Sequence, residues 1–185
     1  MTKLIYAGVG PRNTPMKVQE QMAALGKQLE EMGFILSSGD GIGADQAWAS
    51  EVKPENARIY LAESKPSCPH GLVPDFLQDQ WTFADKHFGK HRKGMKLTSQ
   101  NAYVQYLFMR NLNILLGPDL TKPEPVQFVA YWYEKDCPNG WAGGTGHTVS
   151  MARDKDINIP CFNIALDKDC EALDALVMKL LESKS

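Results

Sequence analysis

Short apolar runs alternate along the chain with longer segments in which apolar residues recur every three or four positions. The run Leu4–Val9 ends at a Gly-Pro pair, which is typical of a buried strand before a tight loop. Next we expect a helix with Thr14 as N-cap, Pro15 at its first position and Gly33 as its left-handed C-terminal cap. Its apolar face consists of Val18, Met22, Leu25, Leu29 and Met32.

The same order repeats once more in the first third of the chain and is followed by a third strand. Phe34–Ser38 is a second apolar run, and Ala57–Ala62 is a third. Between them, Ala44–Ala49 is rich in small residues that allow a helix to pack closely on a sheet. Strands that alternate with helices predict right-handed crossovers and therefore a parallel sheet.

The second half is less regular before the order returns. Residues 63–98 carry prolines and a charged stretch, so we expect an irregular excursion there, interrupted by helical spacing at Leu77, Trp81, Ala84 and Phe88. A helix from Ser99 to about Asn113 is apolar nearly all round, which predicts burial on several sides. The remaining expected elements are the strand Val126–Trp132, a helix from about His147 to Arg153, the strand Ile159–Ile164 and an amphipathic C-terminal helix.

These elements predict an α/β protein with a three-layer, Rossmann-like fold: a mainly parallel central sheet with helices on both faces. The 185 residues fit one domain, 1–185, and 43% apolar residues suffice for its core. We find no apolar run of about 18–20 residues and no signal-peptide pattern, so we expect a cytoplasmic protein that does not enter the membrane. In that compartment Cys68, Cys137, Cys161 and Cys170 are expected to be free thiols.

Three glycine-rich loops follow predicted strands: Gly8–Arg12, Gly39–Asp45 and Gly143–Thr148. Parallel sheets bind ligands at the carboxyl ends of their strands, and helix N-termini there offer unpaired N–H groups that suit phosphate. Each loop alone is explained as well by tight packing, so the hypothesis depends on their convergence. The residues themselves predict the following ligand-binding set: Gly10, Pro11, Arg12, Gly39, Asp40, Gly41, Gly43, Asp45, Arg110, Gly143, Gly144, Thr145, Gly146, His147 and Thr148.

The charged residues of this set have different expected roles. Arg12 suits a bidentate phosphate contact, and Asp40 suits acceptance from a ribose hydroxyl. Arg110 lies in an apolar helix, so its charge needs either a carboxylate or a ligand phosphate. If the protein is an enzyme, Asp40, Asp45 and His147 are the candidates for acid, base or nucleophile, although Asp45 also suits a helix N-terminus and His147 a purely structural hydrogen bond.

One dense basic cluster lies in the excursion and consists of Lys86, His87, Lys90, His91, Arg92, Lys93 and Lys96. Such a cluster forms either a solvated face or a contact with a nucleic-acid backbone. The net charge of −2 does not favour a protein that coats nucleic acid. Histidines and cysteines near the cluster lack a complete zinc-ligand pattern, so we expect no metal, and we expect no cofactor.

The loops resemble motifs of the DprA/LOG (SLOG) superfamily of Rossmann-like proteins, nearest to its DprA-like branch. Gly8–Arg12 resembles the G-x-R loop of that branch, and Ser38–Ala47 resembles its S-G-x-x-x-G-x-D-x-A signature. Arg110 and Asn111 resemble its R-N pair, which adds Asn111 to the expected ligand-binding residues, and Gly143–Thr148 resembles its late glycine loop. The resemblance spans nearly the whole chain.

The resemblance implies a pocket for a nucleotide or a nucleotide-derived, phosphate-bearing molecule. It also implies two alternatives: hydrolysis or transfer at the N-glycosidic bond of nucleoside monophosphates, as in the LOG branch, and binding of single-stranded DNA in recombination, as in DprA proteins, which usually have additional domains. The LOG loop reads P-G-G-x-G-T-x-x-E, whereas Val149 and Ser150 stand here where its glutamate would be, which counts against hydrolysis. Members often assemble, so we expect a homo-oligomer that uses part of Tyr103–Met109.

Overall fold

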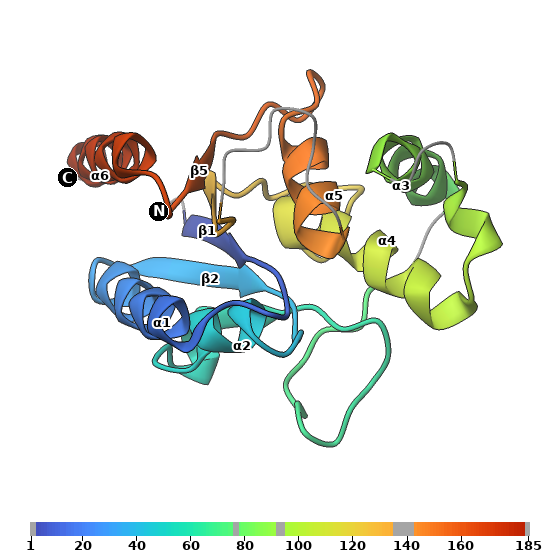
Figure 1. Ribbon diagram of the computed structural model, residues 1–185, viewed down its shortest axis with the longest axis horizontal. Coiled ribbons are helices and arrows are strands. Elements are labelled where there is room, and N and C mark those ends of the chain that lie inside the picture. The colour runs from blue at the N-terminus through green and yellow to red at the C-terminus, as the bar shows by residue number, and fades with distance from the viewer. Residues whose placement is uncertain (1–2, 76–77, 92–94, 135–142, 184–185) are drawn as a thin grey trace.

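The computed structural model describes residues 3–75, 78–91, 95–134 and 143–183, and within them five strands form one parallel sheet (Figure 1). Its strand order is β3-β2-β1-β4-β5, so the chain proceeds outward from β1 in one direction and then returns to its other side. The architecture confirms the predicted Rossmann-like α/β fold. The strands are β1 (Leu4–Val9), β2 (Phe34–Ser38), β3 (Ala57–Ile59), β4 (Phe128–Tyr131) and β5 (Cys161–Asn163).

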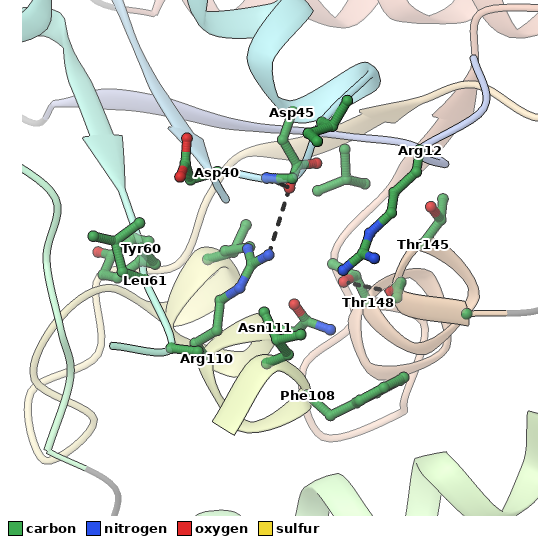
Figure 2. Close-up of a pocket in the computed structure, with 18 of the residues that line it drawn as sticks. Arg12, Asp40, Asp45, Tyr60, Leu61, Phe108, Arg110, Asn111, Thr145 and Thr148 are labelled. Atoms are coloured by element: carbon green, nitrogen blue, oxygen red, sulfur yellow. Dashed lines mark hydrogen bonds and ion pairs between the residues drawn. The ribbon is translucent and has the colours of Figure 1, made fainter. Parts of the chain in front are cut away.

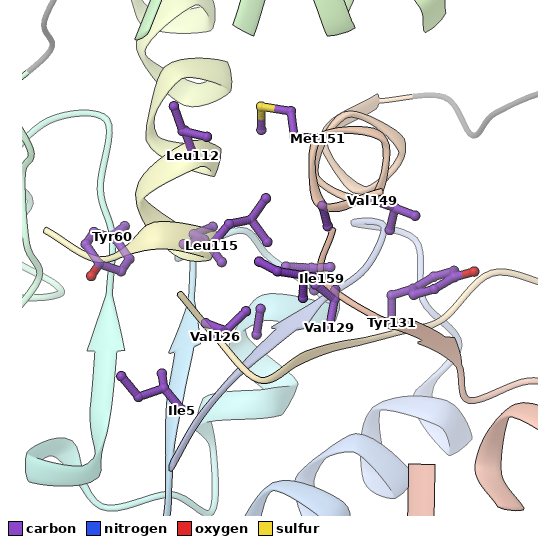
Figure 3. Close-up of a cluster of buried hydrophobic side chains, with 14 residues drawn as sticks. Ile5, Tyr60, Leu112, Leu115, Val126, Val129, Tyr131, Val149, Met151 and Ile159 are labelled. Carbon is purple, nitrogen blue, oxygen red and sulfur yellow. The ribbon is translucent and has the colours of Figure 1, made fainter. Parts of the chain in front are cut away.

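The helices cover both faces of this sheet. They are α1 (Met16–Glu31), α2 (Ala44–Ala49), α3 (Gln78–His91), α4 (Ala102–Leu116), α5 (Gly143–Ala152) and α6 (Asp167–Glu182). Alternate residues of β1 point to opposite faces, as the pleat of a strand requires. Ile5, Ala7 and Val9 pack with residues of α4 and α5 in one apolar cluster, shown in Figure 3. Leu4 and Tyr6 pack in a second cluster with residues of α1, α2 and α6.

The helix α3 packs on α4 and α5 and forms a third apolar cluster away from the sheet. Phe88 of α3 meets Phe108 of α4 edge to face, with ring centroids 4.8 Å apart. The expected excursion is therefore in part a helix, preceded by an irregular loop over residues 61–75 (Figure 1). The expectation that α4 is buried on several sides is wrong for its first half, because Tyr103 and Tyr106 are more than a third exposed.

Several element boundaries differ from the predicted ones. Thr14 does not cap α1: its hydroxyl donates to the Pro11 carbonyl, and Pro15 occupies the N-cap position instead. The helix α4 begins three residues later than expected, because Asn101 caps it by accepting from the Val104 N–H. Gly33 has a φ of +85°, which confirms the predicted left-handed end of α1.

The strand β3 is shorter than predicted, and Tyr60 continues it only through a single bridge to Leu72. Cys68, Cys161 and Cys170 are free thiols, and Cys137 lies outside the described residues. In the part of the chain that the structure describes, none of the helices has both the length and the apolarity needed to cross a bilayer.

Candidate ligand-binding site

A cavity of about 580 Å³ lies at the carboxyl edge of the sheet, where β1 and β4 are neighbours (Figure 2). This is the point at which the strand order reverses, and open α/β sheets bind ligands there. The loops after β1, β2 and β3, the helix α4 and the start of α5 all contribute to its lining. Of the predicted residues, it brings together Gly10, Pro11, Arg12, Asp40, Gly41, Asp45, Arg110, Asn111, Gly143, Gly144, Thr145 and Thr148.

Four predicted residues, Gly39, Gly43, Gly146 and His147, are not among the described residues that line this cavity. Two of them shape it indirectly. Gly39 lies against the guanidinium of Arg110, and Gly43 has a φ of +89° at the N-cap of α2. A Cβ on Gly43 would lie 2.4 Å from the carbonyl oxygen of Arg12, so only glycine fits where these two loops cross. Gly146 is buried within α5.

Arg110 is the most unusual charged residue of the site. It is only 7% exposed, and Nη2 lies 3.5 Å from Oδ2 of Asp45, its only ion-pair partner among the described residues. Nε and Nη1 are buried and find no acceptor in the described parts of the chain. A buried guanidinium is costly unless its donors are satisfied. The site therefore holds a cation with hydrogen-bonding capacity left over.

Asp45 is buried beside this guanidinium at the start of α2. One oxygen of its carboxylate accepts a hydrogen bond from the Gly41 N–H at 3.1 Å, which keeps the glycine loop folded over it. Burial raises the pKa of Asp45 above its usual value, although the charge of Arg110 and the Gly41 N–H act in the opposite direction. Of the two partners expected for Arg110, the structure shows the carboxylate, which the guanidinium contacts once and at a long distance.

A second ion pair stands at the other end of the β2 loop. Nζ of Lys65 lies 3.0 Å from Oδ2 of Asp40, and both residues line the cavity. Lys65 belongs to the irregular loop after β3, and sequence analysis missed it because no periodicity or motif marks that loop. It also missed the apolar wall that the exposed half of α4 supplies through Tyr103, Leu107 and its neighbours.

The N-terminus of α5 forms the opposite wall. The helix begins at Gly143, so the glycine run is its first turn and not a loop before it. Gly143, Gly144 and Thr145 line the cavity, and the first N–H groups of a helix have no intrahelical acceptors. Figure 2 shows the exposed Arg12 side chain extending toward Thr145 and Thr148. A cation and a helix N-terminus thus face the same space, as an anion requires.

His147 lies behind the wall of the cavity, fully buried. Its Nε2 is 2.9 Å from the Ala84 carbonyl oxygen, and its Nδ1 is 3.4 Å from Nδ2 of Asn111. The ring also packs edge-on against Phe108, with centroids 4.9 Å apart. This placement opposes the hypothesis that His147 is a catalytic acid, because α3 covers the face of α5 from which it projects.

The basic cluster is partly used inside the protein. Lys86 donates to Asp154 at 2.9 Å, and the buried His87 contacts both Ser150 and Asp154 of the α5 region. These contacts attach α3 to α5. The side chains of Lys90, His91, Arg92 and Lys93 lie outside the described residues, and binding of single-stranded DNA by the cluster stays a prediction.

Fold and cavity together define a Rossmann-like α/β protein with a charged site at its topological switch point. Within the described residues, no three side chains of His, Cys, Asp or Glu are grouped so that they could hold a metal ion. Comparison of the chain with protein-family models, with curated proteins and with solved structures finds no significant match.

Proposed function

We propose that the cavity binds a nucleotide or a nucleotide-derived small molecule through its phosphate. The observation that carries this proposal is Arg110, a guanidinium more than nine-tenths buried at the cavity, with two nitrogens for which the described residues supply no acceptor. Buried donors in proteins nearly always have a hydrogen-bond acceptor, and a buried donor without one calls for an explanation such as a binding role. An incoming anionic oxygen offsets the charge of this group.

The distribution of charge around the cavity favours a ligand with one compact anionic end. Arg12 and the first turn of α5 form the part that suits the phosphate. Arg110 offsets further negative charge, and the Gly39–Asp45 loop lies where a ribose or base would rest. Tyr103, Leu107 and Phe108 supply an apolar wall on which an aromatic base can stack.

The resemblance of the glycine motifs to the DprA/LOG superfamily supports the same class of ligand. Twelve residues of the predicted set, including Arg12, Asp45 and Gly144, lie around one cavity. A shared cavity is the arrangement that the hypothesis required.

Isothermal titration with nucleoside monophosphates, diphosphates and cyclic nucleotides tests the proposal. We expect at least one of them to bind the wild-type protein, and we expect Arg110→Gln to weaken that binding about tenfold or more, because it removes a charge-assisted hydrogen bond. Lys179→Gln, on the exposed surface of α6, removes one positive charge away from the cavity and is the matched control. If no member of the panel binds the wild-type protein, the proposal is wrong.

A second candidate function is cleavage or transfer at an N-glycosidic bond. The observation in its favour is that two carboxyl groups line one cavity: Asp45, whose pKa burial raises, and Asp40, which Lys65 neutralises. A carboxyl group with a raised pKa suits a general acid. Release of free base from a nucleoside monophosphate, abolished in Asp45→Asn, would support this function, and a complete lack of turnover would exclude it for the substrates tested.

A further inference from the structure

The side-chain amide of Asn111 stands between the cavity and the buried imidazole of His147. Asn111 lines the cavity but is only 4% exposed, so the packing around it restricts its motion. Its Nδ2 is 3.4 Å from Nδ1 of His147, whose Nε2 is 2.9 Å from the carbonyl oxygen of Ala84. Three groups from α4, α5 and α3 thus form one chain of hydrogen bonds.

The chemistry of these groups fixes the direction of that chain. A backbone carbonyl oxygen can only accept, so Nε2 of His147 carries the hydrogen that it donates to Ala84. In a neutral imidazole the other nitrogen, Nδ1, is then an acceptor. Asn111 must therefore direct its NH₂ group at His147, because its carbonyl oxygen would meet the lone pair of Nδ1.

The amide oxygen of Asn111 is consequently left for the cavity. Figure 2 shows Oδ1 of Asn111 on the side of the amide that faces the space between Arg110 and Arg12. None of the described residues donates a hydrogen bond to this oxygen. The two carboxylates of the site differ from it in charge: Oδ2 of Asp40 contacts Lys65, and Oδ2 of Asp45 contacts Arg110 and the Gly41 N–H, whereas the oxygen of Asn111 is neutral.

We propose that Asn111 is a specificity-determining acceptor, held in one orientation by His147 as a positioning residue, and that it selects ligands that carry a hydrogen-bond donor beside their phosphate. This inference rests on the proposed function and narrows it. Arg12, Lys65 and Arg110 are positively charged donors, so their strongest contacts are with the anion. The neutral oxygen of Asn111 can only accept, so it favours a ligand that carries a donor. The donor is a ribose hydroxyl or an amine of the base.

The packing of His147 explains why the orientation persists. The ring is fully buried and makes T-shaped contacts with Phe108, at 4.9 Å, and with Phe88, at 6.5 Å. Full burial and aromatic contacts with α3 and α4 restrict rotation of the imidazole. The amide of Asn111 therefore has a partner of constant polarity before any ligand binds.

Titration of four matched ligands separates the two sources of the donor. The probes are adenosine 5′-monophosphate, its 2′-deoxy and 3′-deoxy forms, and purine riboside 5′-monophosphate, which lacks the exocyclic amine. We expect the wild-type protein to bind one of the three altered probes about tenfold more weakly than adenosine 5′-monophosphate. This is the effect of losing one hydrogen bond and leaving the oxygen of Asn111 without a donor. In Asn111→Leu and in His147→Phe we expect this ratio to fall toward one. Equal affinity of the wild-type protein for all four probes, or a ratio unchanged in Asn111→Leu, overturns the proposal.

Nitrogen NMR of the wild-type protein without ligand tests the relay independently of binding and of the folding of the variants. We expect His147 at neutral pH to carry its hydrogen on Nε2 and none on Nδ1. A hydrogen on Nδ1 overturns the inferred direction of the relay. If that direction holds but adenosine 5′-monophosphate and the other nucleotides do not bind, the proposed function fails, and with it the ligand preference, while the structural role of His147 stands.

Discussion

Nη1 of Arg110 occupies the space that a side chain on Gly39 would fill: a Cβ built there would lie 1.8 Å from this nitrogen. Glycine at this position is thus required by the close approach of a side chain from α4, since the backbone of Gly39 does not adopt a positive φ. The first glycine of the β2 loop serves the site by making room for its buried cation.

Gly39→Ala should consequently displace Arg110 and weaken nucleotide binding about tenfold or more, with a loss of about 1–3 kcal/mol in the free energy of unfolding from overpacking. Titration calorimetry and urea denaturation measure the two effects. Gly144→Ala is the matched control for stability, because the nearest atom to its added Cβ is Nδ2 of Asn111 at 4.0 Å. A Gly39→Ala protein that binds like the wild type would show that Arg110 has no part in recognition.

Replacement of both members of the buried pair should separate stability from binding. The described residues leave two donors of Arg110 unsatisfied, and the carboxylate of Asp45 is desolvated. Arg110→Met combined with Asp45→Asn should therefore raise the free energy of unfolding by about 1–3 kcal/mol. Ligand binding should be lost in the same protein. Denaturation with urea and titration with nucleotide test the two statements, and a destabilised double variant would mean that the pair serves the fold.

The stability of the protein in acid should depend on Asp154. Hydrogen bonds from Lys86 and from the Asp156 N–H lower the pKa of Asp154 to about 2 from its usual 3.8. The folded state thus binds this proton more weakly than the unfolded state does, so the contribution of Asp154 is present above pH 3.8 and is lost as the pH falls toward 2.

Asp154→Asn should accordingly be less stable than the wild type at pH 7, and the difference should shrink between pH 4 and pH 2. Chemical denaturation of both proteins across this range provides the measurement. Asp119→Asn serves as a comparison from an exposed turn. Hydrogen bonds within that turn, first of all the one from the Thr121 side chain, lower the pKa of Asp119 as well. If the difference in free energy of unfolding between Asp154→Asn and the wild type did not change with pH, the stabilising role of the Asp154 carboxylate would be contradicted.

Arg12 should matter for binding and not for folding. Its side chain is exposed and extends over the cavity toward the first turn of α5, so Arg12→Gln should weaken nucleotide binding and leave the melting temperature nearly unchanged. The decrease should be greatest at low salt, because the contact is exposed to solvent. Lys179→Gln controls for the loss of one positive charge, and equal affinity of the two variants would remove Arg12 from the site.

Periodicity carries enough information to predict most of this fold. Apolar runs such as Leu4–Val9 and the helical spacing up to Gly33 are local patterns, and both elements form as predicted. The start of α5 differs from the prediction because glycine has a low helix propensity; the helix nevertheless includes Gly143 and Gly144, and it packs against α3 and α4.

The candidate site was predictable where a motif marks it and not elsewhere. Asp45 lies in a glycine-rich motif, and Arg110 is a charge in an apolar helix, so both could be predicted. Lys65 reaches the cavity only because the irregular loop after β3 folds back over Asp40. His147 was expected in the site and lies behind it. Its burial depends on α3, a helix whose position on α4 and α5 is a tertiary property that no local pattern contains.

The strand order places the candidate site where a ligand can connect the two halves of the sheet. Arg12 follows β1, whereas Thr145 follows β4, and these two strands meet where the two arms of the sheet join. A molecule that touches both residues spans the seam between an N-terminal arm, β1 to β3, and a C-terminal arm, β4 and β5. A bound ligand would hold the two arms of the sheet together, so they could separate only after the ligand dissociates.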